Sequence, residues 1–503
     1  MVRLALALAC VALAACARLP DGERTRSSAL DGGSETRLGR ALAPAIKANP
    51  GKSGVYALPD GRDAFAARVL LARFAERSLD VQYYIWRGDT TGGLLYEALW
   101  QAAERGVRVR LLLDDNNTGG LDEALAALDA HANIEVRLFN PYVSRRFRFI
   151  DLASDFSRLN RRMHNKSFTA DGQATIVGGR NVGDEYFGGE SPVEFADLDA
   201  LAVGAVVREV SAEFDAYWNS ASAYPASLLL AAPRPDSAEQ VRAAWTKLNG
   251  APQAARYLET LRTTPLVKQL VAGDMPLEWA PARVVSDDPS KVLHPPERRD
   301  LHMLQKLDAA LGMPRRELDL VSPYFVPTED GTVTLVALAE RGIRVRVLTN
   351  SLAATDVAPV HAGYAKYREA LLRGGVRLHE LKPSARVEGS GREQHGGGSE
   401  ASLHAKTFAV DRERLFVGSF NFDPRSARLN TEMGIVVDSP SLAARLSQAL
   451  DRELARNAYE VRLAGGNLEW LDGETRHTSE PHAGFFRRAW IGLLSILPIE
   501  WLL

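Results

Sequence analysis

Apolar and polar residues alternate with two different periods in the first half of the chain, and the order of these periods predicts a fold. Apolar positions recur at helical spacing over residues 66–74 and again over 94–102. Each of these segments leads into a short apolar run typical of a strand, at 79–86 and at 107–113. A strand, a helix and a second strand in this order indicate a crossover between parallel strands.

The same pattern returns in the second half of the chain. The sequence Ala-Glu-Arg-Gly-Val-Arg-Val-Arg at 103–110 is repeated as Ala-Glu-Arg-Gly-Ile-Arg-Val-Arg at 339–346, an offset of 236 residues. Met-His-Asn-Lys-Ser-Phe at 163–168 is echoed by Leu-His-Ala-Lys-Thr-Phe at 403–408, an offset of 240 residues. Offsets so similar indicate one duplication with small changes in loop length. We therefore predict an α/β fold of two duplicated lobes, each a mixed, largely parallel sheet flanked by helices, with pseudo-two-fold symmetry and the site between the lobes.

The segments outside the two lobes differ from them in composition. Residues 17–53 contain little apolar periodicity, and a helical pattern flanked by prolines separates the lobes. The predicted parts are a signal peptide at 1–16, a tether at 17–53, lobe 1 at 54–230, a helical connector at 231–276, lobe 2 at 277–460 and a C-terminal tail at 461–503.

The N-terminus has the pattern of a secretory signal. Arg3 is followed by an apolar run from Leu4 to Ala15, which is too short to span a bilayer because a membrane-spanning helix needs about twenty residues. The small residues before Cys16 resemble a bacterial lipobox, so we predict that Cys16 is lipidated. A plain signal peptide and an uncleaved anchor are the alternatives. Lipidation would place the protein in the bacterial cell envelope, anchored on the periplasmic side of a membrane.

The C-terminal tail is predicted to lie at a membrane surface. Its apolar run at 489–499 is interrupted by Pro498 and is too short to cross hydrocarbon. Trp490, Trp501 and the pair Arg487-Arg488 are residue types favoured at the boundary between water and lipid. The alternative is that the run packs against the body of the protein.

Charge and cysteine content exclude some classes of protein. The 61 Lys and Arg residues nearly balance the 63 Asp and Glu residues, which disfavours a protein that coats nucleic acid through bulk positive charge. We therefore expect no nucleic-acid partner. Both cysteines, Cys10 and Cys16, precede residue 20, so the body has no disulfide framework and no cysteine zinc site.

The two echoed segments carry the candidate chemistry. His164 and Lys166, like His404 and Lys406, lie two residues apart in strand-like runs, so both side chains of each pair share one face. A neutral imidazole can attack phosphorus, a second imidazolium can protonate the leaving alkoxide, and cations and amides can hold the phosphoryl oxygens. Phosphodiester exchange needs this set of groups. It requires no metal and no organic cofactor.

The motif His-x-Lys-x4-Asp, followed by Gly-Gly or Gly-Ser and then Asn, resembles the signature of the phospholipase D superfamily and occurs twice. The resemblance implies that one histidine forms a covalent phosphohistidine while the other acts as general acid and then base; family habit makes His164 the nucleophile, although the roles could be reversed. It implies that Glu432 orients His164 and that Asp199 orients His404. Asp171 and Asp411, assigned to the catalytic motif, are expected to anchor hairpin turns. The predicted phosphate contacts are Lys166, Lys406, Asn181, Asn421, Ser419 and Gly179.

Segments 78–86, 160–166 and 321–327 further resemble bacterial cardiolipin synthases. This likeness implies transfer of a phosphatidyl group from a phospholipid to phosphatidylglycerol at a membrane surface. The donor, phosphatidylglycerol or phosphatidylethanolamine, is left open, as is any helper protein. A phospholipase D that forms phosphatidic acid, a nuclease of the superfamily and an inactive lipid-binding scaffold are the rival functions.

Two charged clusters near the first motif have competing interpretations. Six arginines between Arg145 and Arg162 could gather anionic headgroups or form a solvated basic face. Asp114 and Asp115 end a strand and could suggest a metal site, but a turn or helix cap is favoured because no carboxylates recur at Thr349-Asn350.

Overall fold

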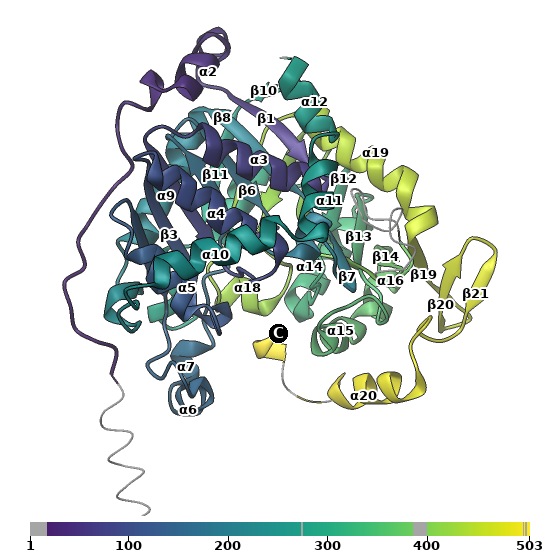
Figure 1. The fold of residues 1–503 in the computed structure, drawn as a ribbon. Helices are drawn as coiled ribbons and strands as arrows, with labels where there is room; N and C mark the ends of the chain where they lie inside the picture. Colours follow the sequence, from purple (N-terminus) through teal and green to yellow (C-terminus); the bar gives the residue numbers. More distant parts are fainter. Residues whose placement is uncertain (1–17, 273–274, 386–399, 496, 498–499) are drawn as a thin grey trace, which may run out of the picture.

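A computed structural model describes residues 18–272, 275–385, 400–495, 497 and 500–503. Two lobes, each built around one large sheet, lie against each other (Figure 1). The predicted signal peptide and Cys16 lie outside the described residues.

The sheet of lobe 1 has nine strands, and its centre contains the predicted crossovers. Strands β2, β3 and β4 are parallel, and all the other neighbours in the sheet are antiparallel. In spatial order the strands are β10 (Glu278–Ala280), β1 (Ser53–Leu58), β8 (Asp199–Gly204), β6 (Ala174–Gly178), β5 (Ser167–Ala170), β2 (Ser78–Tyr83), β3 (Arg108–Asp114), β4 (Ile134–Phe139) and β9 (Ala223–Pro225).

The sheet of lobe 2 has ten strands and repeats the central order and directions of the first. Strands β12, β13 and β14 are again parallel, while the remaining neighbours are antiparallel. In spatial order the strands are β11 (Ala282–Ser286), β18 (Met433–Val437), β17 (Arg414–Gly418), β16 (Lys406–Val410), β12 (Glu317–Val321), β13 (Arg344–Asn350), β14 (Arg377–Leu381), β19 (Ala458–Ala464), β20 (Asn467–Asp472) and β21 (Thr475–His477).

The duplicated α/β fold is thus confirmed, and the sheets are mixed. Parallel pairing is less extensive than expected, because it is confined to two strand pairs in each sheet. The antiparallel pairs arise from the hairpins that carry the histidine motifs, β5–β6 and β16–β17. Hairpins form antiparallel pairs by necessity.

Helices cover both faces of each central sheet, which explains the unbroken apolar runs of the strands. In β3, Leu111 and Leu113 pack in the core under α3 and α4, whereas Leu112 packs against α9 on the other face. Complete burial of such a side chain contributes about 1.5–3 kcal/mol. The main helices of the body are α3 (Gly61–Phe74), α4 (Thr90–Glu104), α5 (Asp122–Asp129), α8 (Asp184–Phe187), α9 (Ala205–Trp218), α13 (Met303–Leu311), α14 (Thr328–Glu340), α15 (Ala358–Ala365), α16 (Arg368–Arg373), α18 (Pro424–Arg428) and α19 (Pro440–Asn457).

An apolar interface and a short sheet join the lobes. Val177 and Ala202 of lobe 1 belong to one buried cluster with Val417 and Ile435 of lobe 2. In addition, β7 (Val193–Ala196) pairs in parallel with β15 (Glu400–Leu403), so one strand from each lobe forms a two-stranded sheet. These contacts fix the position of one histidine motif relative to the other.

The predicted tether and connector pack on lobe 1. Residues 18–53 contain α2 (Arg37–Ala48), and the backbone before it binds the lobe, because Ala29 N donates to Asp215 Oδ2 over 2.9 Å and Arg137 donates to the Thr25 carbonyl. The described part of this segment is therefore docked rather than a free tether. The connector forms α10 (Ser237–Asn249), α11 (Pro252–Leu261) and α12 (Pro265–Ala272), whose apolar side chains join the core of lobe 1.

The C-terminal tail extends lobe 2. Strands β20 and β21 continue its sheet, and α20 (Phe485–Ser495) follows. Ile491 and Leu494 of α20 are buried against Leu352 and Ala362. One face of the predicted interfacial helix thus packs on the body.

Candidate active site

Each histidine motif is held by the backbone of the opposite lobe. His164 lies just before β5, and its amide donates to the Thr431 carbonyl over 2.8 Å. His404 lies just before β16, and its amide donates to the Ala196 carbonyl, also over 2.8 Å. The two imidazoles therefore sit where the lobes meet, as the duplication predicted.

A buried carboxylate from the opposite lobe binds each imidazole. His164 Nδ1 lies 2.8 Å from Glu432 Oε2, which agrees with the expected pair. His404 Nδ1 lies 2.6 Å from Asp197 Oδ2. Both contacts engage Nδ1, so Nε2 is the ring nitrogen left for substrate on each side.

The expectation that Asp199 orients His404 is wrong. Asp199 Oδ2 instead accepts a hydrogen bond of 2.9 Å from Arg68 within lobe 1. Strand register explains the difference: Gly178 pairs with Asp199 in lobe 1 and Gly418 pairs with Gly434 in lobe 2. Asp199 therefore corresponds to Gly434, and the counterpart of Glu432 is two residues earlier, at Asp197.

Gly179 and Ser419, the predicted phosphate contacts, lie beside these acids. Their amides donate to the Leu198 and Met433 carbonyls, and the Ser419 hydroxyl donates to Glu432 Oε2 over 2.5 Å. A Cβ atom at Gly179 would lie 2.2 Å from Asp197 Oδ1, so only glycine leaves room for this carboxylate. The two motifs are thus matched to acids of different length.

Both motif lysines are buried beside the imidazoles. Lys166 Nζ donates to the His164 carbonyl over 2.5 Å, and Lys406 Nζ donates to the His404 carbonyl. Lys406 Nζ also lies 2.9 Å from His404 Nδ1. Because Nδ1 cannot donate to Asp197 and accept from Lys406 at once, we assign its proton to the shorter, charge-paired contact with Asp197.

Charged groups of each lobe affect the pKa of the histidine in the other lobe. The pKa of His164 is held well below its usual value. Burial is the largest cause, the charge of Lys166 is the next, and the charge of Lys406 from the other lobe follows. Burial and Lys406 lower the pKa of His404 to about 4, against the opposing effect of Asp197. Burial lowers the pKa of Lys406 to about 8. At neutral pH both imidazoles are therefore neutral before substrate binds, as a nucleophile must be.

The two carboxyl groups that bind the imidazoles differ in pKa. Burial raises the pKa of Glu432 to about 7. Burial also acts to raise the pKa of Asp197, but His404 and Lys406 outweigh it and hold that pKa well below the usual range. At neutral pH His404 thus faces a fully ionised partner, whereas His164 faces one that is partly protonated.

The motif asparagines Asn181 and Asn421 and three aromatic rings complete the surroundings of the two imidazoles. Asn181 is bound on both sides, since Oδ1 accepts from the Ile85 amide and Nδ2 donates to the Tyr186 hydroxyl. Asn421 Oδ1 is buried without a hydrogen-bond partner among the described residues. The Tyr84 ring lies 5.0 Å from the His164 ring, and the Tyr186 and Phe195 rings lie 5.1 and 4.9 Å from the His404 ring. The sequence reasoning missed these rings, although Tyr84 directly follows β2 and could have been found as a strand-end residue.

Asp171 and Asp411 anchor turns, as expected. Asp171 accepts from the amides of Arg77 and Ser78 over 2.8 and 3.0 Å, and Asp411 accepts from those of Arg316 and Glu317 over 2.7 and 3.0 Å. Each aspartate thus ties its hairpin to the start of β2 or β12. The turns lie at the ends of β5 and β16 remote from the histidines.

Comparison with known proteins defines the family. The family model described as "Cardiolipin synthase, PLD-like domain" matches twice, at residues 71–218 and 307–454. The chain is 48% identical over 475 residues to cardiolipin synthase C of Escherichia coli K12, covering 93% of this chain and 100% of that protein. This chain belongs to the cardiolipin synthase family of the phospholipase D superfamily. It is accordingly an enzyme of that superfamily.

Two more distant proteins are also similar to this cardiolipin synthase homologue. It is 26% identical over 408 residues to cardiolipin synthase A of Pseudomonas aeruginosa, covering 80% of this chain and 67% of that protein. A phosphatidylserine synthase structure from Haemophilus influenzae aligns with a TM-score of 0.54 at 14% identity, covering 84% of this chain and 91% of that one. The latter likeness shows a shared fold.

The charged clusters near the first motif are structural. Asp114 and Asp115 form ion pairs with Arg162 and Arg145 at 2.8 and 2.5 Å. Asp114 also caps a short 3-10 turn, which supports the cap interpretation. Most of the six arginines are likewise bound within the protein, and Arg146 alone among them makes no hydrogen bond or ion pair with described residues. The bonded ones are Arg145, Arg148, Arg158, Arg161 and Arg162.

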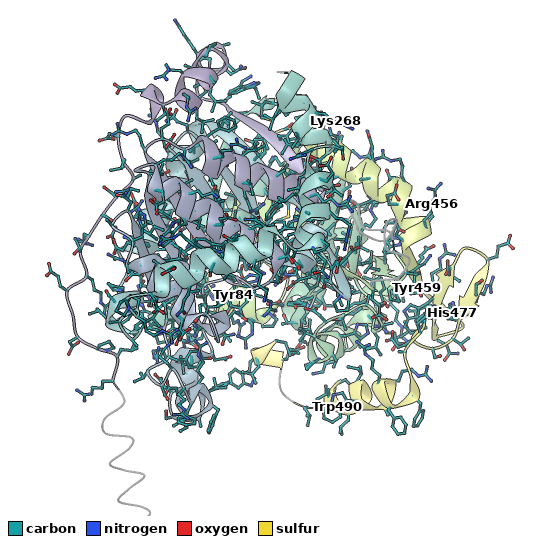
Figure 2. All side chains as sticks on the ribbon, in the orientation of Figure 1. Tyr84, Lys268, Arg456, Tyr459, His477 and Trp490 are labelled. Atoms are coloured by element: carbon teal, nitrogen blue, oxygen red, sulfur yellow. The ribbon has the colours of Figure 1, made fainter. Side chains whose placement is uncertain are left out.

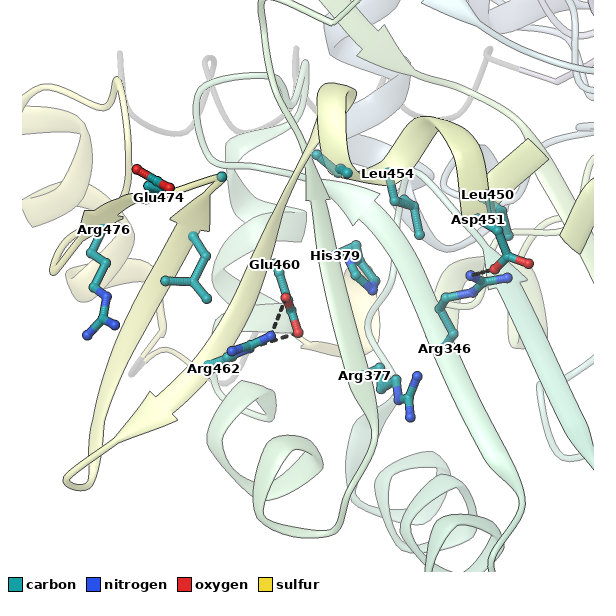
Figure 3. A pocket seen from close by; sticks show the side chains of 14 residues that line it. Arg346, Arg377, His379, Leu450, Asp451, Leu454, Glu460, Arg462, Glu474 and Arg476 are labelled. Carbon is teal, nitrogen blue, oxygen red and sulfur yellow. Dashed lines mark hydrogen bonds and ion pairs between the residues drawn. The ribbon is translucent and has the colours of Figure 1, made fainter. Parts of the chain in front are cut away.

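A cavity of about 1000 Å³ at the outer edge of lobe 2 is lined by neither His164 nor His404 (Figure 3). Several of its charged groups are paired, Arg346 with Asp451 and Arg462 with Glu460. Within the described residues, no group of His, Cys, Asp and Glu side chains could hold a metal ion. None of the helices in this described part of the chain has the length and apolar character needed to span a membrane.

Proposed function

We propose that this enzyme is a cardiolipin synthase that transfers a phosphatidyl group to phosphatidylglycerol through a phosphohistidine. The observation that carries the proposal is the crossed arrangement of the site, in which each imidazole is bound through Nδ1 to an acid of the opposite lobe. This leaves two Nε2 atoms for one phosphodiester. Membership of the cardiolipin synthase family supports the choice of lipid substrates.

In the first step, His164 Nε2 attacks the phosphorus of the donor lipid. His404 takes up a solvent proton on Nε2 as the negatively charged substrate binds. A nitrogen–phosphorus bond then forms, the bond from phosphorus to the headgroup oxygen breaks, and the Nε2–H of the His404 imidazolium gives its proton to that oxygen. The headgroup alcohol leaves. In the second step His404 takes the proton of a free hydroxyl of phosphatidylglycerol, whose oxygen attacks phosphorus and releases His164.

The acids support this assignment of roles. The histidine that carries the proton becomes an imidazolium, which an ionised carboxylate stabilises. Asp197 is held ionised by its surroundings, whereas the pKa of Glu432 is raised to about 7. His404 is therefore the better acid and base. The negative phosphodiester would raise the pKa of His404 when substrate binds.

Lys166, Lys406 and Asn421 are proposed to hold the phosphoryl oxygens. The lysines are buried beside the histidines and donate through Nζ, and Asn421 would donate through Nδ2. Its Oδ1, unpartnered in the described structure, would accept from a substrate hydroxyl. Asn181 is proposed to position the Tyr186 hydroxyl beside His404.

We also propose that the enzyme works at a membrane of the bacterial envelope, on the periplasmic side and attached through Cys16. The lipobox-like sequence supports this location. Mass spectrometry of the mature N-terminus, with Cys16→Ser as control, tests it: a diacylated Cys16 is expected, and an unmodified N-terminus contradicts it.

The activity is tested with purified enzyme and phosphatidylglycerol vesicles. Equal amounts of cardiolipin and glycerol are expected, and His164→Ala should form neither. Phosphatidic acid without cardiolipin would instead identify a hydrolase. Vesicles that also contain phosphatidylethanolamine with a labelled headgroup identify the donor, because only a donor releases its own headgroup.

A further inference from the structure

Large apolar side chains are exposed in two patches of the surface. Among the described residues, 11 of the 17 exposed large apolar side chains lie in two short stretches of the chain. The first, here called the α6–α7 patch, consists of Phe147, Phe149, Ile150, Leu152 and Phe156. The second, here called the tail patch, consists of Phe485, Phe486, Trp490, Leu493, Leu497 and Trp501. Such concentration marks an interaction site.

The α6–α7 patch reverses the usual polarity of a surface helix. In α6 (Arg148–Ser154), Asp151 points inward and accepts from the Ser144 amide over 2.6 Å, while Phe149 and Ile150 are 70% and 51% exposed. The adjoining α7 (Phe156–Leu159) buries Leu159 and exposes Phe156. Ion pairs hold the base of the patch, including that of Arg145 with Asp115. The exposed rings are thus presented on an anchored support.

Four of the six residues of the tail patch lie on α20, a helix that is apolar on two faces. Ile491 and Leu494 of α20 pack against lobe 2. Phe486, Trp490 and Leu493 follow one another at helical spacing on the exposed side, and Phe486 is 86% exposed. A helix that is apolar on both faces requires an apolar partner on each. Lobe 2 supplies one of these partners.

Sequence and hydrogen bonds link both patches to the segments that carry the active site. The α6–α7 patch immediately precedes the His164 motif. At the other patch, Arg425, four residues after Asn421, receives the end of the tail: its side chain donates to the Leu502 carbonyl over 2.9 Å and to Asn160 Oδ1 over 2.7 Å. One arginine thus joins the end of α7, the tail and the rim of the site.

The views agree with these contacts. α6, α7 and α20 lie at the lower edge of the molecule in Figure 1, where the described chain also begins, and Trp490 projects at that edge in Figure 2. A flat surface below the molecule would therefore touch both patches.

We propose that the two patches together form the surface by which the enzyme docks on a phospholipid bilayer, with the rings of the α6–α7 patch inserted beside the site. This proposal rests on the proposed lipid substrate and adds the surface that meets it. A bilayer is the occupant because its flat apolar interior matches two separate patches on one side. Arg146 flanks the rings of the α6–α7 patch and suits anionic headgroups, whereas Arg487 and Arg488 beside the tail rings also donate to the Thr355 and Ala483 carbonyls.

The test compares Phe149→Asp/Ile150→Asp and Phe486→Asp/Trp490→Asp with a matched control, Phe74→Asp/Met313→Asp. Phe74 and Met313 are 47% and 65% exposed. They lie near the turns of Asp171 and Asp411, at the ends of the sheets remote from the motif histidines. All the variants change exposed residues, so their thermal unfolding midpoints should match that of the native chain. Binding is measured by flotation with vesicles of phosphatidylglycerol and phosphatidylethanolamine, and turnover is measured on vesicles and on dispersed short-chain phosphatidylglycerol.

Each patch variant should bind vesicles about tenfold more weakly or worse, since each loses two buried apolar side chains on the bilayer. Turnover on vesicles should fall with binding while turnover of the short-chain lipid is kept, and the control should match the native chain. Vesicle binding unchanged in both patch variants would overturn the proposal. So would a native dimer that the α6–α7 variant dissociates, because a second copy would then cover the patch. If the native enzyme binds vesicles through the patches but makes no cardiolipin, the proposed function fails and the docking surface stands.

Discussion

Exchanging Asp197 and Asp199 one at a time for asparagine should separate catalysis from stability. Asp197→Asn removes the charge that stabilises the His404 imidazolium but keeps the shape of the side chain. The hydrogen bond of 2.6 Å is buried and charge-assisted. Loss of such a bond costs about 3–4 kcal/mol, so kcat should fall by roughly 10²–10³.

Asp199→Asn should act on folding. Arg68 is 1% exposed, and its remaining partners are the Tyr83 hydroxyl and the Ala64 carbonyl, neither of which carries a formal negative charge at neutral pH. Breaking a buried ion pair on one side costs about 3–5 kcal/mol because a buried charge loses its counter-charge. The free energy of unfolding should fall accordingly, while the enzyme that remains folded should keep kcat within a few-fold of the native value.

The measurements are cardiolipin formation at saturating phosphatidylglycerol and unfolding in urea, followed for the native chain and both variants. Native turnover in a folded Asp197→Asn variant would refute the reasoning. Loss of turnover in a fully stable Asp199→Asn variant would refute it equally, since the roles of the two acids would then be exchanged.

Three further predictions follow from the site. His404→Ala should slow both steps, because it removes the acid of the first step and the base of the second; any phosphatidyl group that stays on the protein, detected by mass spectrometry of peptides, should lie on His164, and modification elsewhere would contradict the assigned roles. Turnover should decline above about pH 8, because the pKa of Lys406 is about 8 and its deprotonation removes a positive charge from the phosphoryl site. Lys406→Arg should move this decline to higher pH, since arginine stays protonated. An unchanged pH profile in this variant would show that Lys406 does not bind the substrate. Gly179→Ala should lower kcat by about tenfold or more, because the added Cβ displaces the Asp197 carboxylate from His404, whereas native kinetics would show that this carboxylate has room to move.

The sequence predicted what local patterns and the duplication determine. Helical and strand periods gave the crossover units, and the repeat placed His164 and His404 at corresponding points. Glu432 was found because it is a single acid in its segment. Asp197 was missed because two acids stand two residues apart, and only the pairing of Gly178 with Asp199 shows which of them reaches His404.

Other features depend on contacts between distant segments. Tyr186 and Phe195 reach His404 from lobe 1 across the interface, which no local pattern indicates. The difference between Gly179 and Ser419 became meaningful only with the acids beside them in place. The docked course of residues 18–53 likewise depends on partners more than a hundred residues away, such as Asp215.

The central claim is that an imidazole from each lobe acts on the same phosphorus. A crystal structure with vanadate, which adopts the five-coordinate geometry of phosphoryl transfer, tests it most directly. The account predicts one vanadium atom bonded to His164 Nε2, with the oxygen at the opposite apex hydrogen-bonded to His404 Nε2. Vanadate bound to one histidine, with the other turned away or too distant to reach it, would contradict the account.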